Sequence, residues 1–255
     1  MKTGTIKSII LLCLLCCAGR GYAQHVTFLQ QGRIEYEKRK NMHALLDESF
    51  GDDNQSIKEL VKKETPNFKV TYFDLLFDQQ TTLFKPGRDN PDNSRQLMED
   101  GPGEANIIYS LLEKQESISQ KKVFEQTYLV TDSIRRIKWK ITDETRKIAG
   151  FDCRRANAVI MDSIYVVAFY TDAIITPGGP ESFTGLPGMI LGLAMPHEHI
   201  TWFATKVLMD DRNNNAWQPP AKGKKVNKKE LEAAMEKAVK GWGSYGKPYI
   251  KAVLL

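Results

Sequence analysis

Cysteine is scarce in this sequence, and its distribution excludes a fold held together by disulfides. The chain has 255 residues and four cysteines, and Cys13, Cys16 and Cys17 all lie in an apolar stretch near the N-terminus. Only Cys153 lies beyond that stretch, and a single cysteine cannot form an internal disulfide. We expect Cys153 to be buried as a small hydrophobic side chain, because burial is the commonest fate of an unpaired cysteine.

Hydrophobic runs long enough to cross a bilayer are also missing. Lys2 and Lys7 form a positively charged region before an apolar run at residues 9–15. The run is too short to span a membrane, and Gly21-Tyr22-Ala23 offers small residues for cleavage. This pattern predicts a signal peptide over residues 1–23, and therefore export, with a mature chain that begins at Gln24. Acylation of Cys16 or Cys17, as in a lipoprotein, stays open as an alternative.

The chain lacks a strong excess of charge of one sign. Its formal charge is +5, and the predicted signal peptide removes Lys2, Lys7 and Arg20 from that total. The remaining charge is too small to indicate binding to nucleic acid. Residues 222–229 hold five lysines, which we interpret as a solvated linker, although contact with an anionic outer-membrane surface is an alternative.

Sequence motifs of the common enzyme classes are missing as well. No serine lies in a Gly-x-Ser-x-Gly turn, and no glycine loop opens a helix as in a phosphate-binding site. His197 and His199 would point to one side of a strand, and Cys153 could complete a zinc or copper site with them in space. Two imidazoles alone are not enough for such a site, so we expect no cofactor. A metal-dependent or thiol-dependent enzyme that uses Cys153 with His197 or His199 is the alternative function.

The sequence is rich in short β-strand patterns separated by turn residues. Such spacing is typical of an all-β protein, and we predict a mainly β fold with a single antiparallel, strongly curved sheet or partly closed barrel. Two short helices are expected within residues 41–63, with Ser56 capping the second, and a C-terminal helix should start at Asn227 and Glu230 and end at Gly241. Residues 85–103 form a long polar loop, which we expect to be disordered. The predicted strands are 28–39 (as an edge strand), 70–77, 79–84, 107–112, 122–130, 136–141 (followed by a turn at 142–145), 154–161, 164–171, 189–195 and 199–208.

The centre of the chain is a loop rich in proline and glycine, which we call the Pro/Gly loop, between the apolar strands predicted at 164–171 and 189–195. Leu186-Pro187-Gly188-Met189 suits a type II turn, because proline sets the first central backbone angle and glycine accepts the positive φ of the second. Gly185 to Gly188 therefore form a structural turn. The apolar runs on its two sides should be neighbours in one sheet.

The same residues carry a resemblance to a known family. Gly185-Leu186-Pro187-Gly188-Met189-Ile190 resembles the motif of the GLPGLI family, secreted proteins of Bacteroidetes-type bacteria, with Met189 in place of leucine. The family's approach to the motif is similar to Phe169-Tyr170-Thr171, Gly179-Pro180 and Phe183, and its Gly-aromatic-x-Cys-x-x-Ala segment is similar to residues 150–156. The resemblance covers residues 150–207. It implies export and a β-rich fold, and it implies no established reaction.

Aromatic residues could form a binding site in a curved sheet. Such a sheet can enclose an apolar ligand or present an edge to a partner, and the same side chains could equally be plain core. The candidate lining residues are Tyr165, Phe169, Phe183, Leu186, Trp202 and Phe203.

From these features we expect a β-rich domain over residues 24–216, followed at 217–255 by a basic linker and a helix. The function we expect is non-enzymatic binding or accessory work in the cell envelope. The mature chain would then be periplasmic, associated with the outer membrane or secreted. Its partner would be a small apolar ligand or an envelope protein.

Overall fold

The computed structural model describes residues 29–50, 54–92, 101–209, 217–243 and 246–255. The predicted signal peptide and its cleavage position therefore lie outside the described residues. The strands are β1 (Gly32–Asn41), β2 (Phe68–Phe77), β3 (Thr81–Pro86), β4 (Ile107–Leu111), β5 (Glu116–Val123), β6 (Gln126–Ser133), β7 (Lys140–Ile148), β8 (Phe151–Ile160), β9 (Ile164–Thr171), β10 (Met189–Met195), β11 (Ile200–Leu208) and β12 (Lys224–Val226). The helices are α2 (Met42–Ser49), α3 (Gln55–Glu64), α4 (Lys228–Ala238) and α5 (Gly246–Leu254).

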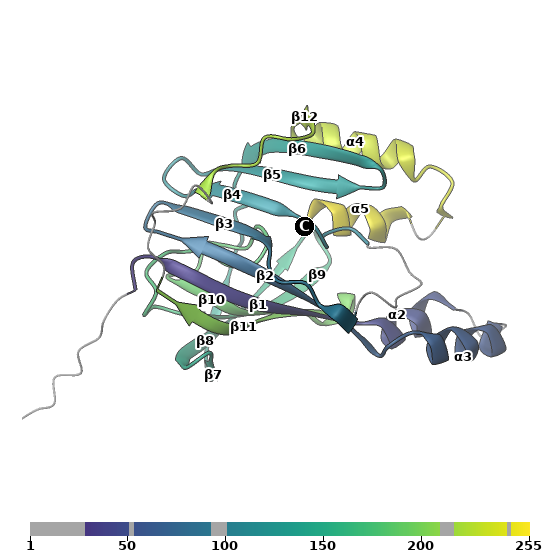
Figure 1. Ribbon diagram of the computed structural model, residues 1–255, viewed down its shortest axis with the longest axis horizontal. Coiled ribbons are helices and arrows are strands. Elements are labelled where there is room, and N and C mark those ends of the chain that lie inside the picture. The colour runs from purple at the N-terminus through teal and green to yellow at the C-terminus, as the bar shows by residue number, and fades with distance from the viewer. Residues whose placement is uncertain (1–28, 51–53, 93–100, 210–216, 244–245) are drawn as a thin grey trace, which may run out of the picture.

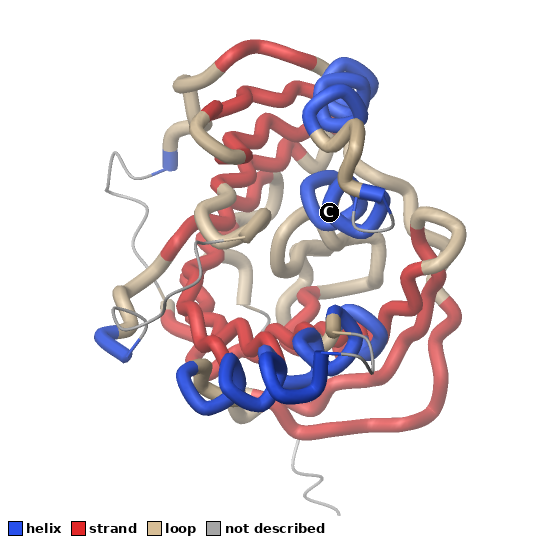
Figure 2. The backbone as a smooth tube through the Cα atoms, turned by 90° about the vertical axis from the view of Figure 1, so that its right-hand side faces the viewer, coloured by secondary structure: helices blue, strands red, loops and turns tan. Residues whose placement is uncertain are grey.

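All of these strands belong to one sheet, in the order β12-β6-β5-β4-β3-β2-β1-β11-β10-β9-β8-β7 (Figure 1). This confirms the prediction of a mainly β fold with a single sheet. Neighbouring strands are antiparallel except β12 and β6, which are parallel. Figure 2 shows that the sheet is bent, that it is not closed, and that α5 lies on its hollow side.

The prediction that the first strand lies at an edge is wrong, because β1 pairs with β11 on one side and with β2 on the other. Ile34, Tyr36 and Lys38 of β1 are buried, whereas Glu35 and Glu37 on the other face are only half-buried. A central antiparallel strand with one solvated face has the same alternation as an edge strand. The pattern therefore located the faces of the strand and not its neighbours.

Two other predicted elements differ from the structure. The predicted strand 122–130 is the end of β5, a turn and the start of β6, and Phe124 takes a positive φ in a turn that lacks glycine, proline and asparagine. The predicted turn at 142–145 lies inside β7, where the pairing with β8 is irregular between Ile141 and Thr145. Polar residues belong in β7 because it is an exposed edge strand.

The predicted pairing of the two apolar strands around the Pro/Gly loop is confirmed, because β9 pairs with β10 in antiparallel register. Gly188 has a positive φ of 142°, as the turn prediction required. The turn itself is tighter than type II, because the Gly188 N–H donates to the Leu186 carbonyl and the Met189 N–H donates to the distant Ile174 carbonyl. A Cβ atom at position 188 would lie 2.1 Å from the Thr171 carbonyl oxygen, so only glycine fits there.

The C-terminal segment is part of the sheet structure and contains one helix more than expected. Asn227 and Glu230 form the predicted capping box at the start of α4, and β12 adds residues of the expected linker to the sheet. Leu231 and Met235 of α4 pack with Val253 of α5 against the β5–β6 hairpin, and Leu255 joins the main hydrophobic core.

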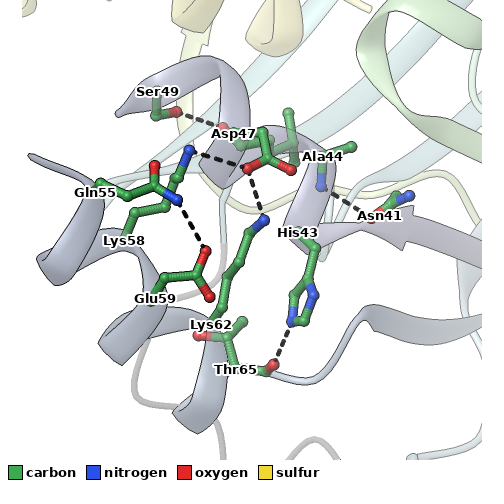
Figure 3. A network of polar contacts seen from close by, with 11 residues as sticks. Asn41, His43, Ala44, Asp47, Ser49, Gln55, Lys58, Glu59, Lys62 and Thr65 are labelled. Carbon is green, nitrogen blue, oxygen red and sulfur yellow. Dashed lines mark hydrogen bonds and ion pairs between the residues drawn. The ribbon is translucent and has the colours of Figure 1, made fainter. Parts of the chain in front are cut away.

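The two short helices predicted within residues 41–63 are present as α2 and α3. They form a pair at one end of the sheet (Figures 1 and 3). Asp47 of α2 accepts a hydrogen bond from Lys62 of α3 at 2.6 Å, and Lys58 lies 3.5 Å away (Figure 3). Ser56 is not the cap of α3, because the helix starts one residue earlier, after Asn54. In the part of the chain that the structure describes, no helix is long and apolar enough to cross a membrane.

Candidate functional site

The aromatic residues proposed as a ligand lining lie in the hydrophobic core. Phe169, Phe183, Leu186 and Trp202 are buried, whereas Tyr165 and Phe203 are partly buried against the same cluster. Core packing accounts for their burial. Their role in binding an apolar ligand stays a prediction.

The structure does not bring His197, His199 and Cys153 together. His197 lies in a short 3₁₀ helix at Pro196–Glu198, and the Nε2 atom of His199 lies 2.9 Å from Glu48 Oε1. Cys153 is fully buried and donates a hydrogen bond to the Phe151 carbonyl, and burial raises the pKa of its thiol to about 12. No group of three His, Cys, Asp or Glu side chains that could hold a metal occurs among the described residues.

A cluster of buried polar side chains lies on the inner face of the sheet instead, together with the half-buried Thr71. We call Lys38, Thr71, Glu104, Asn106 and Glu181 the inner polar cluster. The Nζ atom of Lys38 donates to Glu104 Oε1 at 3.1 Å and to the Gly103 carbonyl at 3.2 Å. Thr71 donates to the other oxygen of Glu104 at 2.8 Å, and Asn106 donates to Glu181 Oε2 at 2.9 Å. The cluster thus joins β1 and β2 to the loop before β4 and to the Pro/Gly loop.

The two carboxyl groups of this cluster are shifted in opposite directions. Burial acts to raise the pKa of Glu104, but Lys38, Lys69 and the hydrogen bond from Thr71 hold it below its usual range. Burial raises the pKa of Glu181, and the nearby Lys38 and Lys121 offset that effect only in part. Glu104 is therefore the charged partner of Lys38.

Aromatic rings enclose the ammonium group of Lys38. Its Nζ atom lies 5.3 Å from the ring centre of Trp202 and 5.8 Å from that of Phe73. The Nε1 atom of Trp202 is buried without a hydrogen-bond partner among the described residues. The two rings stabilise a cation at this buried position.

A small cavity lies beside the inner polar cluster, where the end of α5 meets the sheet, and we call it the C-terminal cavity. Its volume is about 60 Å³, which is enough for a few water molecules or one small ion. The polar side chains that line it are Ser117, Ser119, Lys121, Asp132, Ser133, Arg135, Ser182 and Lys228.

Polar side chains that line this cavity donate hydrogen bonds to the main-chain oxygens at the end of α5. Lys121 donates to the Val253 carbonyl at 2.8 Å, Arg135 to the Leu254 carbonyl at 2.5 Å, and Ser182 to the Leu255 carbonyl at 2.7 Å. The last carbonyls of a helix have no partner within the helix, and cations are favourable there. These contacts fix the C-terminal segment to the inner face of the sheet.

Sequence reasoning missed both polar groups. One signal was present, because Lys38 follows Ile34 and Tyr36 in the two-residue alternation and therefore had to point inward. Ser117, Ser119 and Lys121 alternate in the same way in β5. Glu104, Asn106 and Glu181 come from irregular segments, so no periodic pattern marked them.

Comparison with known proteins gives a short family match and a structural likeness. Residues 158–192 match the model of a family described as "Protein of unknown function (Porph_ging)", and this stretch includes Glu181 and the Leu186-Pro187-Gly188 turn. No curated protein matches the chain.

Two solved structures of a protein named PNGF-II, in the C2 and P21 space groups, are similar in fold. Their TM-scores are 0.51 and 0.50 and their sequence identities 14% and 16%, over 78% of this chain. The match covers 31% and 32% of those chains, so this chain spans about a third of their length. At this identity the likeness concerns the fold alone. The family match is to a family of unknown function and covers the stretch from the end of β8 to β10.

Proposed function

We propose that this chain is an exported, non-enzymatic binding or accessory protein of the cell envelope, of the GLPGLI type, and that it binds its ligand at the C-terminal cavity. The observation that carries the proposal is the lining of that cavity. Lys121, Arg135 and Lys228 meet there, and none of them forms an ion pair among the described residues. Perturbed, partly buried cations in a cavity are typical of binding sites.

The geometry around Cys153 gives no support to the enzyme alternative. A thiol must ionise to act as a nucleophile or a metal ligand, and burial raises the pKa of Cys153 to about 12. His199 contacts Glu48 instead of the thiol.

The basic C-terminal segment is proposed as a second contact with the envelope. Lys222, Lys224, Lys225 and Lys229 are exposed around β12 and the start of α4. An exposed group of lysines attracts anionic membrane surfaces. The ligand and this surface would then both lie near β6.

Cell fractionation and native mass spectrometry of the full chain test the proposal. We expect the chain in the periplasmic or outer-membrane fraction, cleaved before Gln24, with a bound mass that disappears on denaturation. A chain that stays uncleaved in the cytoplasm would contradict the proposal. Stoichiometric zinc or copper that is lost in a His197→Ala, His199→Ala double variant would favour the enzyme alternative.

A further inference from the structure

We propose that the C-terminal cavity binds a small oxyanion, a phosphate or carboxylate group, between Lys121, Arg135 and Lys228. This inference rests on the proposed function, because it names the chemistry of the ligand for the same cavity. It is argued from the charge of the lining, from hydrogen-bond donors that have no partner, and from the space available.

The charge of the lining is unbalanced. Its described residues include three cationic side chains, one carboxylate side chain, that of Asp132, and the terminal carboxyl group of Leu255, which accepts a hydrogen bond from Ser182. Asp132 is already engaged, because it accepts the backbone N–H groups of Ser133 and Lys228. Like charges in a poorly solvated site repel each other strongly, so an anion between the three cations would relieve that repulsion.

Contacts with the end of α5 do not use all the donors of these cations. Arg135 bonds the Leu254 carbonyl through Nη2, while its Nη1 atom is buried without a partner among the described residues. A buried N–H without a partner costs free energy. The side chain of Lys228 has no hydrogen bond or ion pair in the described part of the chain, although it lines the cavity.

Hydroxyl groups complete the site. Ser117, Ser119 and Ser182 also line the cavity. Oxyanions are recognised by short hydrogen bonds from guanidinium, ammonium and hydroxyl groups. A volume of about 60 Å³ suits one such group and excludes a large apolar body.

A second hollow shows where the rest of a substituted oxyanion would lie. It has a volume of about 360 Å³ and shares Lys228 and Leu254 with the C-terminal cavity. Met161, Ile250 and Lys251 also line it. A phosphate ester could therefore place its phosphate in the cavity and its organic part in this second hollow.

Calorimetric titration of the full chain with inorganic phosphate tests the inference, with ionic strength held constant by sodium chloride. We expect saturable binding that Lys228→Gln weakens by about tenfold, the loss expected for one charge-assisted hydrogen bond. Lys229→Gln is the matched control, because Lys229 is the next residue of α4, is exposed and carries the same charge. The control should change the affinity by less than about twofold, since exposed charges contribute little.

Three further probes distinguish the sources of the oxyanion. Acetate tests a carboxylate, and glycerol 3-phosphate tests a phosphate ester against free phosphate. Tighter binding of the ester than of phosphate would place its organic part in the second hollow. Equal binding would identify inorganic phosphate as the ligand.

Sulfate keeps a constant charge, so it reports the protonation of the protein alone. It should bind about tenfold more weakly as pH rises through about 8, because burial lowers the pKa of Lys121 to about 8. Arg135, Lys228 and Glu181 are the charged or titratable groups that act on Lys121.

The inference is overturned if none of these oxyanions binds more tightly than chloride, or if Lys228→Gln and Lys229→Gln weaken binding equally. Either result would leave the proposed function standing if the chain is exported and carries a bound mass. An unexported chain that binds phosphate would instead contradict the proposed function and leave the cavity assignment intact.

Discussion

Lys38 is the residue whose burial organises the inner face of the sheet. Its side chain is only 4% exposed and that of its partner Glu104 is 5% exposed. Burying two charges costs several kcal/mol in lost solvation, and here the attraction within the pair is supplemented by Thr71, the Gly103 carbonyl and two aromatic rings. The pair therefore ties the central strand to a loop that has no other regular pairing.

Replacing Lys38 by methionine should lower the free energy of unfolding by up to about 3 kcal/mol, because the buried Glu104 would lose its hydrogen-bonded cation and keep only Thr71 and the nearby Lys69. Chemical denaturation at neutral pH measures the loss. Arg39→Met on the opposite face is the control, and we expect it to cost less than about 1 kcal/mol. Adding Glu104→Gln to Lys38→Met should recover part of the loss, and a double variant as unstable as the sum of both single variants would contradict this account.

Glu181 shows that the Pro/Gly loop does more than reverse the direction of the chain. Its backbone lies in the left-handed region at φ 52°, which is uncommon for a residue other than glycine. This conformation accompanies a fully buried carboxyl that accepts a hydrogen bond from Asn106, and the next residue, Ser182, holds Leu255. The loop thus connects the inner polar cluster to the C-terminal cavity, a link that turn residues alone could not predict.

At the scale of elements, both edges of the sheet resist pairing with other chains. Edge strand β7 is exposed, charged and irregular in its pairing with β8, and edge strand β12 has only three residues, two of them lysines. Charged side chains, irregular pairing and short strands usually keep the edge of a sheet from pairing with another chain. A partner is therefore expected to bind at a cavity or a charged surface rather than by adding a strand.

Helix α3 depends largely on polar contacts for its position, since Val61 is its one half-buried apolar side chain. None of its residues is buried, and Ile57 and Leu60 are 54% and 63% exposed. It touches the rest of the chain mainly through α2, where Asp47 meets Lys58 and Lys62 (Figure 3). A helix with so little apolar burial opens at low free-energy cost.

Asp47→Asn should leave the melting temperature of the whole protein unchanged and increase amide hydrogen exchange in α3. The hydrogen bond from Lys62 is the main cause that lowers the pKa of Asp47, so wild-type protection should also fall as pH drops through that lowered pKa. Hydrogen-exchange mass spectrometry at several pH values follows the effect, with Asp143→Asn in the exposed strand β7 as control. Protection of α3 that does not respond to Asp47→Asn would show that another contact holds the helix.

Helices and strands with a clear hydrophobic periodicity were predictable from the sequence, and contacts between distant segments were not. The β8–β9 hairpin and the β9–β10 pair follow from apolar runs with turn residues between them. The position of β1 in the middle of the sheet depends on pairing with β11, more than 150 residues away. The C-terminal cavity needs β5, Arg135, the Pro/Gly loop and α4 at once, and no local pattern specifies how these segments meet.

At the scale of the whole molecule, the C-terminal segment completes the structure rather than following it. The boundary expected at residue 216 separates β12 from the sheet to which it belongs, and α4 and α5 from the strands against which they pack. Without them, Val123, Tyr128 and Val130 would lose the apolar side chains of α4 and α5. The main core would also lose Leu255, and Lys121 and Arg135 would lose their carbonyl partners.

A chain that ends at residue 216 should therefore fail to unfold cooperatively and should expose apolar surface. Circular dichroism during heating and binding of a hydrophobic dye to the truncated chain measure both effects. The control replaces residues 54–64 by a Gly/Ser linker of equal length, which removes α3 but no buried residue, and it should melt within a few degrees of the full chain. A truncated chain that melts as sharply as this control would contradict the prediction. Residues 24–216 would then fold independently, without the contacts of Lys121 and Arg135 with the end of α5.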